Sequence, residues 1–480
     1  GTFAGLISGT GGLTLSGSST DVLTLSNASN SYTGNTTLNG GTLSISSDSN
    51  LGTPPGVATS GKLAFNGGTL KNTASITLDA NRGMALNASG GTIEVDTAAT
   101  VNYNGIMAGA GALTKAGSGT LILGGINTYT GNTAINAGVL SITNNTGLSA
   151  TTNISVASGG TLDLNFNAAT FGNTNAITLN GTNALTLSGA NITVNNPLTI
   201  NSATTINGTG TGVMTFGGAI TGAANLAFSL TNAGISLPTT TLTGSGSLTV
   251  AANGAIMQTG VLTIPSTASF SASANPITLT ANNNFTGAVS VNNSGANDVT
   301  IVNSGALALG PSNVGGNLNI TAGGSITQAG PLTAPNGATT LAVTAANSDI
   351  LLNQANNLGG VATVFSGILA NIRDVALRNT STSAVTPILS GLVNLRNLAL
   401  TFNAGNIILS NLIASGQVTL IGNSADGSLN VGALSLGTNF ANLTGFVAGL
   451  SGQAAIDIIT LLNIITSGTH YFDGIDMFLG

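Results

Sequence analysis

Charged side chains that could carry out chemistry are scarce in this chain. Of its 480 residues, seven are basic and thirteen are acidic, whereas roughly a quarter of an ordinary soluble domain is charged. The first group of interest places carboxylates close to cations in the sequence, a combination that glycosidases use for general acid and base catalysis. It consists of Lys71, Asp79, Arg82, Glu94 and Asp96.

An acid/base site for carbohydrate would need more than these charges. Sugar-cleaving sites usually carry aromatic platforms, and this neighbourhood offers only Phe65 and Tyr103. We therefore interpret the five charged residues as scattered surface charges that aid solubility. A carbohydrate-active enzyme remains the alternative hypothesis for the chain as a whole.

A second group contains the only concentration of arginine, at Arg373, Arg378 and Arg396, with Asp374 beside the first. Asp374 and Arg378 are four residues apart, which suits a helix, but residues 374–378 can equally form a strand. Ion pairing on a sheet face is the favoured interpretation. A patch that binds sugar or a partner is the alternative.

A third group lies near the end of the sequence, at His470, Tyr471, Asp473 and Asp476. One histidine with two aspartates invites a metal or catalytic interpretation, but beside Gly474 it more often marks a terminal turn. No calcium-binding nonapeptide of the Gly-Gly-x-Gly-x-Asp kind is present. We therefore predict no catalytic, cofactor-binding or metal-binding residue, and no cofactor.

The composition limits the possible partners. Residues 164–297 contain no charged side chain, so this region cannot bind phosphate or carboxylate-ligated metals. The net charge is -6 and no Lys/Arg cluster exists, which makes nucleic acid an unexpected partner. Cysteine is absent, as in many secreted bacterial proteins. The sequence begins at Gly1 without an initiator methionine, as expected of a processed chain or a fragment.

Membrane insertion is also not expected. No apolar run approaches the roughly 20 residues that a membrane-spanning helix needs. Tryptophan is absent and only four tyrosines occur, so the aromatic girdles of strands that cross a bilayer are missing too. We predict that the chain does not span a membrane.

A repeated sequence motif indicates which secondary-structure elements would position these residues. Residues 32–45, YTGNTTLNGGTLSI, return as residues 129–142, YTGNTAINAGVLSI. Each copy follows a short run with apolar residues at alternate positions, which predicts strands with Leu and Ile facing inward. Gly and Asn mark the corners, for example at residues 39–41, 89–91 and 136–138.

The spacing of the strands predicts a solenoid. Leu23 recurs as Leu43 and Leu121 as Leu140, which gives coils of about 20 residues. A longer repeat relates residues 248–263 to residues 318–333 at an offset of 70. The sequence thus predicts an all-β protein built of stacked coils, with apolar residues inside and Thr and Ser outside.

Residues 113–142 resemble the passenger-associated repeat of bacterial autotransporters, LTKxGxGTLxLxGxNTYTGxTTINxGTL, and match it nearly completely at Asn127–Gly131. The first copy, residues 13–45, departs at its front half. Residues 277–291 resemble filamentous-haemagglutinin-like exoproteins, a style that extends over most of residues 240–450. Both resemblances imply a right-handed parallel β-helix exported to the bacterial surface, where many such proteins are adhesins or matrix components.

Together these observations predict the domain organisation and the function. Residues 1–450 are expected to form one continuous β-solenoid, of passenger-repeat style over 1–150 and haemagglutinin style over 240–450. Residues 451–480, with the apolar run 453–465, are expected to form a C-terminal cap. The predicted function is that of an extracellular or cell-surface adhesin, stalk or filament. It would act by rigid display and multivalent contact with cell surfaces or glycans, or by self-association into filaments.

Overall fold

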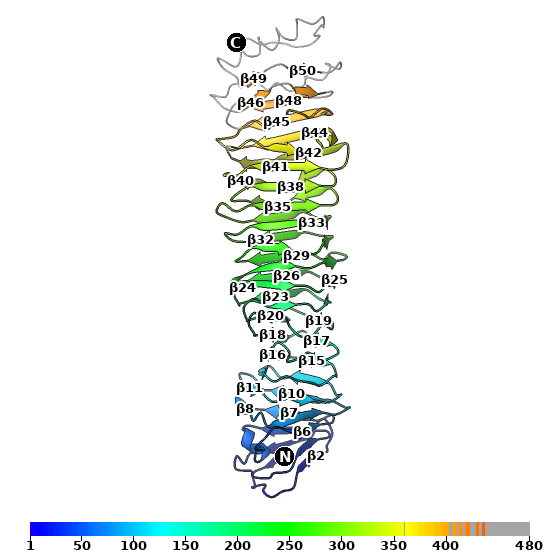
Figure 1. Cartoon of the computed structure of the whole chain (residues 1–480), viewed down its shortest axis with the longest axis vertical. Coiled ribbons are helices and arrows are strands. Elements are labelled where there is room, and N and C mark those ends of the chain that lie inside the picture. The colour runs from blue at the N-terminus through cyan, green and yellow to red at the C-terminus, as the bar shows by residue number, and fades with distance from the viewer. Residues whose placement is uncertain are drawn as a thin grey trace, which may run out of the picture. The chain divides into compact units, whose positions relative to one another are not determined.

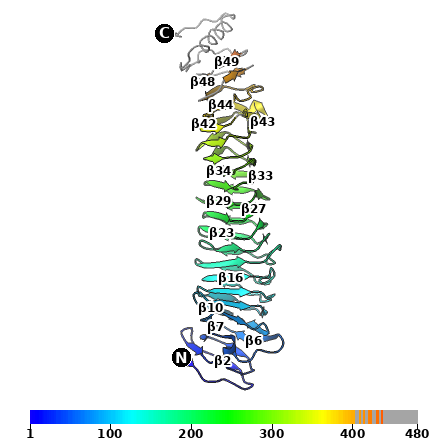
Figure 2. The same ribbon diagram turned by 90° about the vertical axis from the view of Figure 1, so that its left-hand side faces the viewer.

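The computed structural model describes residues 1–359 and 361–402, and the backbone of five strands between residues 407 and 436. Two compact units are present, Gly1–Ala272 (unit 1) and Ser273–Gly480 (unit 2). The predicted all-β solenoid is confirmed: the described strands pair in parallel with strands one turn away, in about 18 turns of about 22 residues. Figure 1 and Figure 2 show the strands of each unit stacked along its axis.

Each turn of unit 1 passes through up to three sheets, as in the order β7, β8, β9, β10. The first sheet contains β1 (Thr2–Phe3), β3 (Val22–Leu25), β5 (Thr42–Ile45), β7 (Thr69–Asn72), β10 (Gly91–Val95), β13 (Leu113–Ala116), β15 (Thr133–Ile135), β17 (Ile154–Val156), β19 (Ile177–Leu179), β22 (Leu198–Ile200), β25 (Ile220–Gly222), β28 (Thr240–Leu242) and β31 (Leu262–Ile264).

The second sheet of unit 1 contains β8 (Ile76–Leu78), β11 (Thr100–Tyr103), β14 (Thr120–Leu123), β16 (Gly138–Ile142), β18 (Gly160–Leu164), β20 (Leu185–Leu187), β23 (Thr204–Gly208), β26 (Leu226–Leu230), β29 (Leu248–Ala252) and β32 (Ala268–Ser271). The third face carries β2 (Leu13–Leu15), β4 (Thr36–Leu38), β6 (Thr59–Phe65), β9 (Arg82–Leu86) and β12 (Met107–Ala108), then β21 (Thr193–Val194), β24 (Gly212–Phe216), β27 (Ala233–Leu237) and β30 (Ile256–Gln258).

Unit 2 continues the same style with its own two main sheets. The first sheet of unit 2 contains β33 (Ile277–Phe285), β35 (Val299–Asn303), β38 (Leu318–Ala322), β41 (Thr339–Val343) and β43 (Val364–Ser366). The second contains β34 (Val289–Asn292), β36 (Leu307–Leu309), β37 (Ser312–Asn313), β39 (Ile326–Gln328), β40 (Leu332–Ala334), β42 (Ser348–Leu358), β44 (Ile372–Asn379), β45 (Asn397–Phe402) and β48 (Val418–Gly422). Two further pairs are β46 (Ile407–Leu409) with β49 (Leu429–Val431), and β47 (Leu412–Ala414) with β50 (Leu434–Leu436).

The core of unit 1 is built from inward-facing ladders. In the second sheet, Leu121 pairs in register with Leu140, and Leu140 with Leu162. All three side chains are fully buried. Their outward neighbours are polar or half-exposed, because side chains alternate along a strand. Burial of one such leucine contributes roughly 1.5–3 kcal/mol, and the same ladder goes on to Leu185, Ile206, Phe228, Val250 and Phe270.

The turns vary in length around the predicted value. Leu121 pairs with Leu140 across a short turn, whereas Thr36 pairs with Leu63 across a clearly longer one. The longer turn contains the 3-10 helix η1 (Asp48–Leu51). Ser47 and Asn50 form a capping box at the start of this helix. A second 3-10 helix, η2 (Leu369–Asn371), belongs to unit 2. Insertions at the corners thus make the average turn longer than the repeated phrase predicts.

The predicted glycine corners are confirmed. Gly41, Gly90 and Gly138 have φ of 68°, 68° and 66°, in the left-handed region that glycine adopts at little cost. A Cβ on Gly138 would also lie 2.4 Å from the carbonyl oxygen of Gly119. The corner therefore requires glycine for both conformation and space.

The predicted continuity of residues 1–450 stays a prediction. The proposed C-terminal cap, residues 451–480, lies outside the described residues.

Candidate functional site

The predicted acid/base group does not form one site. Lys71 on β7 is in register with Glu94 on β10, and its Nζ lies 2.6 Å from Glu94 Oε1 and 2.7 Å from Asp96 Oδ1. Hydrogen bonds from the Lys71 ammonium to Asp96 and then to Glu94 raise the pKa of Lys71. Both carboxylates therefore share one ammonium on a half-exposed surface, where such pairs contribute little to stability.

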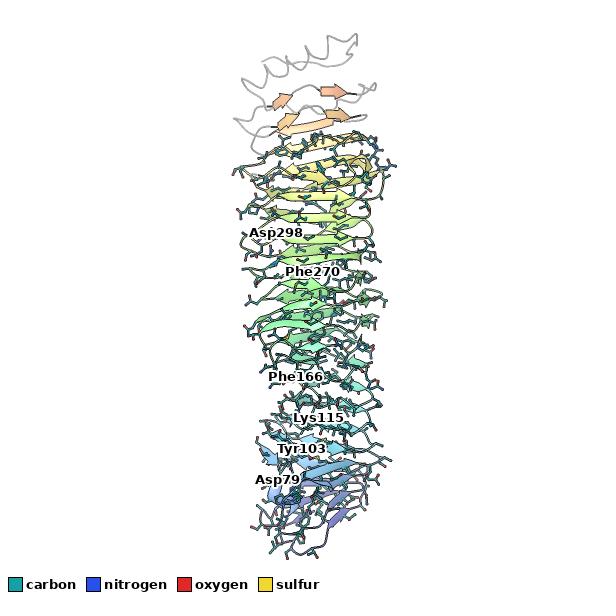
Figure 3. The ribbon with its side chains drawn as sticks, in the orientation of Figure 1. Asp79, Tyr103, Lys115, Phe166, Phe270 and Asp298 are labelled. Carbon is teal, nitrogen blue, oxygen red and sulfur yellow. The ribbon has the colours of Figure 1, made fainter. Side chains whose placement is uncertain are left out.

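Asp79 and Arg82 lie at a different corner of the turn. Asp79 follows Leu78, whose register partner is Tyr103 at the end of β11. Figure 3 labels Asp79 near Tyr103. Asp96 instead precedes β11, so the width of the second sheet separates it from Asp79. Asp79 Oδ1 accepts a hydrogen bond from the backbone N–H of Asn81 at 2.8 Å. The structure thus brings together Lys71, Glu94 and Asp96, and leaves Asp79 and Arg82 apart from them.

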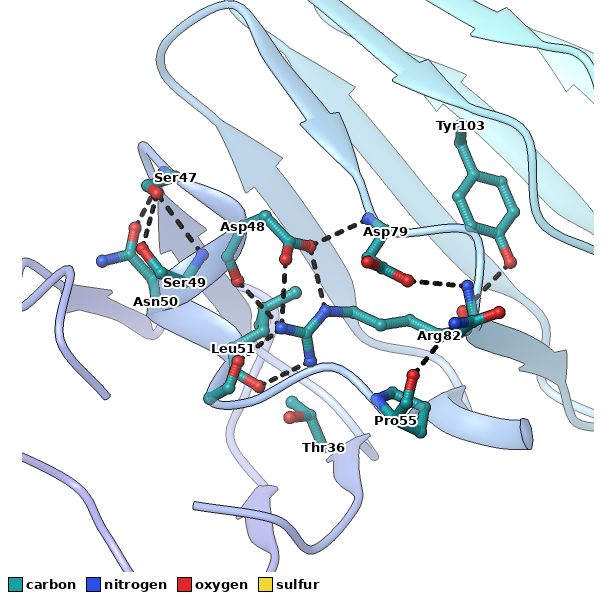
Figure 4. Close-up of polar contacts among 12 residues, drawn as sticks. Thr36, Ser47, Asp48, Ser49, Asn50, Leu51, Pro55, Asp79, Arg82 and Tyr103 are labelled. Atoms are coloured by element: carbon teal, nitrogen blue, oxygen red, sulfur yellow. Dashed lines mark hydrogen bonds and ion pairs between the residues drawn. The ribbon is translucent and has the colours of Figure 1, made fainter. Parts of the chain in front are cut away.

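Arg82 is a structural cation that sequence reasoning assigned to the surface. Its side chain is only 2% exposed. The guanidinium donates to both carboxylate oxygens of Asp48, at 2.9 and 3.1 Å, and to the carbonyl oxygens of Leu51 and Gly52 (Figure 4). The carbonyl oxygen of Arg82 accepts the hydroxyl of Tyr103 at 3.0 Å. This network fastens the inserted 3-10 turn to the third face.

Lys115, in the Leu-Thr-Lys of the second repeat, is also buried, with no exposed surface. Its Nζ donates to the carbonyl oxygens of Ala116, Gly117 and Ala137 at 2.8, 2.7 and 3.0 Å. Burial lowers the pKa of Lys115 to about 8, and the negative charge of Glu94 opposes that shift. The ammonium links two successive turns by their backbones.

Lys115 is expected to make stability depend on pH. The unfolded chain keeps the lysine proton up to about pH 10.5, whereas the folded chain releases it near 8. Because the unfolded state then binds more protons, the free energy of unfolding should rise between pH 8 and 10.5, by up to roughly 3 kcal/mol. Denaturant titrations across this range would measure it, with Lys115→Met as the control. Identical pH profiles for the two proteins would contradict the expectation.

The repeated Tyr-Thr-Gly-Asn-Thr phrase has a structural role inside the solenoid. Tyr129 is buried, and its hydroxyl shares a 2.6 Å hydrogen bond with Thr133. Tyr32 and Thr36 make the same contact at 2.7 Å in the first copy. Burial raises the pKa of Tyr129, so its hydroxyl stays protonated. The tyrosine and the threonine four residues on thus fix the inner corner of each repeat.

Tyr129→Phe is expected to lower the free energy of unfolding by about 1 kcal/mol, because it removes one buried hydrogen bond. Thr133 keeps its 3.1 Å contact with the hydroxyl of Thr151. Thermal or denaturant unfolding would measure the change. The neighbouring exposed Thr130 supplies the control, since Thr130→Ala should stay within about 0.5 kcal/mol of the parent. A Tyr129→Phe protein as stable as the control would contradict this role.

Arg373, Asp374 and Arg378 lie on β44, so residues 374–378 form a strand rather than a helix, and Arg396 directly precedes β45. The predicted ion pairs are present and run between turns: Arg373 binds both carboxylate oxygens of Asp349, at 2.9 and 2.7 Å, and Arg396 binds Asp374. Burial acts to raise the pKa of Asp374, but hydrogen bonds from Arg396 and Asn397 outweigh it and lower that pKa. Arg378 is exposed on the same strand.

Asp163 carries the only charge between Lys115 and Asp298. Its carboxylate accepts the hydroxyl of Ser141 from the preceding turn at 2.7 Å and that of Ser188 from the following turn at 2.6 Å. Asp163 therefore joins three successive turns. Sequence alone could not show this, because each serine lies a full turn away from Asp163 along the chain.

The remaining predicted residues cannot be placed. His470, Tyr471, Asp473 and Asp476 lie outside the described residues. Within residues 1–359 and 361–402, no three His, Cys, Asp or Glu side chains converge as metal ligands would. In the same part of the chain, no helix is both long and apolar enough to cross a bilayer.

A regular feature of unit 1 is a line of outward hydroxyl side chains on the first sheet, here called the threonine column. It consists of Thr178, Thr199, Thr221, Thr241 and Thr263, consecutive register partners on β19, β22, β25, β28 and β31. Each is half-buried or exposed, while the residues on either side along the strands include buried Ile and Leu. Parallel pairing repeats these hydroxyls roughly every 4.8 Å, and β-branching limits their rotamers. The column is therefore uncharged, ordered and multivalent.

Comparison with known proteins identifies the two repeat types. The passenger-associated-transport-repeat matches residues 19–45 and 113–142. The predicted resemblance to autotransporter passengers is thereby confirmed. Repeats of unknown function, DUF5649, match residues 223–292 and 296–365, which contain the two copies of the longer repeat. No solved structure matches the chain significantly.

One curated relative is an autotransporter adhesin. The chain is 43% identical over 115 residues to the adhesin BmaC autotransporter of Brucella suis biovar 1 (strain 1330). The match covers 24% of this chain and 3% of that relative. The similarity thus concerns about a quarter of this chain and only a small part of a much longer relative.

Proposed function

We propose that this chain is a segment of a bacterial surface adhesin, displayed outside the cell, which acts by rigid display and multivalent contact. The observation that carries this proposal is the threonine column, an ordered row of neutral hydroxyls in the charge-free region 164–297. Weak contacts repeated along one rigid row add up when several engage together. The passenger repeats and the adhesin relative support the same location and role.

The role of the titratable groups supports contact rather than catalysis. Lys71 forms ion pairs with both Glu94 and Asp96, and Arg82 is buried against Asp48. A catalytic acid and base must reach the same region of a substrate, whereas Asp79 and Asp96 lie at opposite ends of a sheet. We therefore propose a non-enzymatic function.

The adhesive role can be tested with beads coated with the full chain and applied to cultured host cells. The triple variant Thr178→Lys, Thr221→Lys, Thr263→Lys interrupts the column with charge and is expected to reduce bead attachment at least about tenfold, a loss of about 1.4 kcal/mol. The matched control places lysines outward on the second sheet at Thr186, Ser229 and Ser271. Equal attachment by both variants would exclude the column as the contact surface.

Self-association into filaments stays a prediction from the sequence. Electron microscopy over a concentration series tests it: longer assemblies at higher concentration would support it, and single particles of constant size would argue against it.

A further inference from the structure

In unit 2, one set of outward-facing register partners on successive strands changes from polar to apolar side chains. On the first sheet of unit 2, Thr278, Thr300, Asn319 and Thr340 are successive register partners. The next two positions in the same column are Val364 and Ile388. An outward position that holds hydroxyl and amide groups in four turns thus carries branched aliphatic groups in the following two.

Five exposed aliphatic side chains belong to these two turns, and together they are here called the apolar face. The turns are stacked, since the backbone N–H of Ile388 donates to the carbonyl oxygen of Thr363 at 3.0 Å and Asn394 Nδ2 donates to that of Ala370 at 2.8 Å. The exposed fractions range from 41% to 65%. The members are Val361, Ile368, Val385, Ile388 and Val393.

Contiguous exposed aliphatic groups usually mark a contact surface. Within the sequence, a complementary segment follows the last described strand, β50. Residues 454–465, AAIDIITLLNII, are apolar except at Asp457, Thr460 and Asn463. The intervening residues 437–453 can span roughly 55 Å. A few turns of parallel strands advance only about 5 Å each, so the segment can reach the apolar face.

Both partners are nearly uncharged. Residues 454–465 contain a single charged side chain, Asp457, and residues 361–372 and 380–395 contain none. Arg373 and Arg396 follow Ile368 and Val393 closely in the sequence, but each already pairs with a carboxylate, that of Asp349 and that of Asp374. An apolar segment therefore fits an aliphatic surface whose neighbouring cations are paired.

We propose that the apolar face of unit 2 binds residues 454–465 of the same chain, so that this segment covers the side of the stack. The proposal is independent of the adhesive role. It differs from a cap on the final coil, because the contact is with outward side chains two turns before the last described strands rather than with an open strand edge.

The absence of cysteine allows a direct test in the full chain. The pair Ile388→Cys and Ile459→Cys is expected to form an intramolecular disulfide under mild oxidation. The control pair, Thr300→Cys and Ile459→Cys, uses the same column four turns earlier and should cross-link at least about tenfold less, a difference of about 1.4 kcal/mol. Equal yields, or no cross-link in either pair, would overturn the proposal. Cross-links between two chains would assign the face to a second copy instead.

Hydrogen exchange of the unoxidised full chain gives an independent readout. The variant Ile459→Asp, Leu462→Asp should weaken the contact and raise exchange rates in residues 384–393 at least about tenfold. Residues 299–303, on β35, should exchange as before. Thr460→Asp, at a polar position of the segment, is the matched control. Unchanged exchange in residues 384–393 of the double variant would contradict the proposed contact.

Discussion

Leu140→Asp is expected to disrupt the middle of unit 1. The Leu140 side chain is fully buried between Leu121 and Leu162, its register partners in the adjacent turns. An unpaired carboxylate there would cost several kcal/mol in free energy of unfolding. Because each turn of a solenoid depends on its neighbours, the loss should spread to both flanking turns. Hydrogen exchange of residues 120–123 and 160–164, together with denaturant unfolding, would measure it.

The matched control is Thr161→Asp, one position away from Leu162 on the outward side of β18. Thr161 is half-buried and faces outward, so the new carboxylate stays hydrated. The free energy of unfolding should therefore change by no more than about 0.5 kcal/mol. If Leu140→Asp left exchange and unfolding like those of the control, the inward assignment of the leucine ladder would be wrong.

Arg82→Met is expected to lower the free energy of unfolding by about 3 kcal/mol, because it leaves two buried carbonyl oxygens and a partly exposed carboxylate without their donor. The lost contacts are those with Asp48 and with the carbonyl oxygens of Leu51 and Gly52. The double variant Arg82→Met, Asp48→Asn should recover part of the loss, since it removes the stranded charge. Denaturant unfolding of both variants measures the effect.

Lys71→Met tests whether the ion pairs of Lys71 with Glu94 and Asp96 contribute less to stability than the buried network of Arg82. Lys71 makes two ion pairs as short as those of Arg82, but its side chain and those of Glu94 and Asp96 are 27–37% exposed. Hydrated pairs of this kind contribute at most about 1 kcal/mol. Similar losses for Lys71→Met and Arg82→Met would refute the distinction between a surface pair and a buried structural network.

The fold could be predicted because its determinants are local. The alternation of apolar and polar residues predicted that Leu140 faces inward. The small residues at 136–138 predicted a corner, where Gly138 has a positive φ. Both signals lie within a few residues of the element they define. The turn length was harder to predict, because the insertion around η1 lengthens one turn without disturbing the alternation of the strands on either side.

The contacts of charged residues could not be predicted in the same way. Asp48 and Arg82 are far apart in the sequence, and their meeting depends on how an irregular insertion folds back onto the third face. Asp79 and Asp96 are close in sequence, but the intervening strands place them at opposite ends of the second sheet. Arg373 and Arg396 form ion pairs with carboxylates one turn away. Assigning their segments to strands does not by itself predict which carboxylates these are.

The salt dependence of bead attachment tests whether this segment acts through neutral, repeated contacts rather than through charge or catalysis. Salt at about 1 M shortens the range of electrostatic interactions to roughly 3 Å but leaves neutral contacts in place. We predict equal attachment of the parent chain at about 0.1 and about 1 M salt, and equal attachment of a variant with Lys71→Met, Glu94→Gln and Asp96→Asn. Attachment that disappears at high salt, or in that variant, would contradict the account.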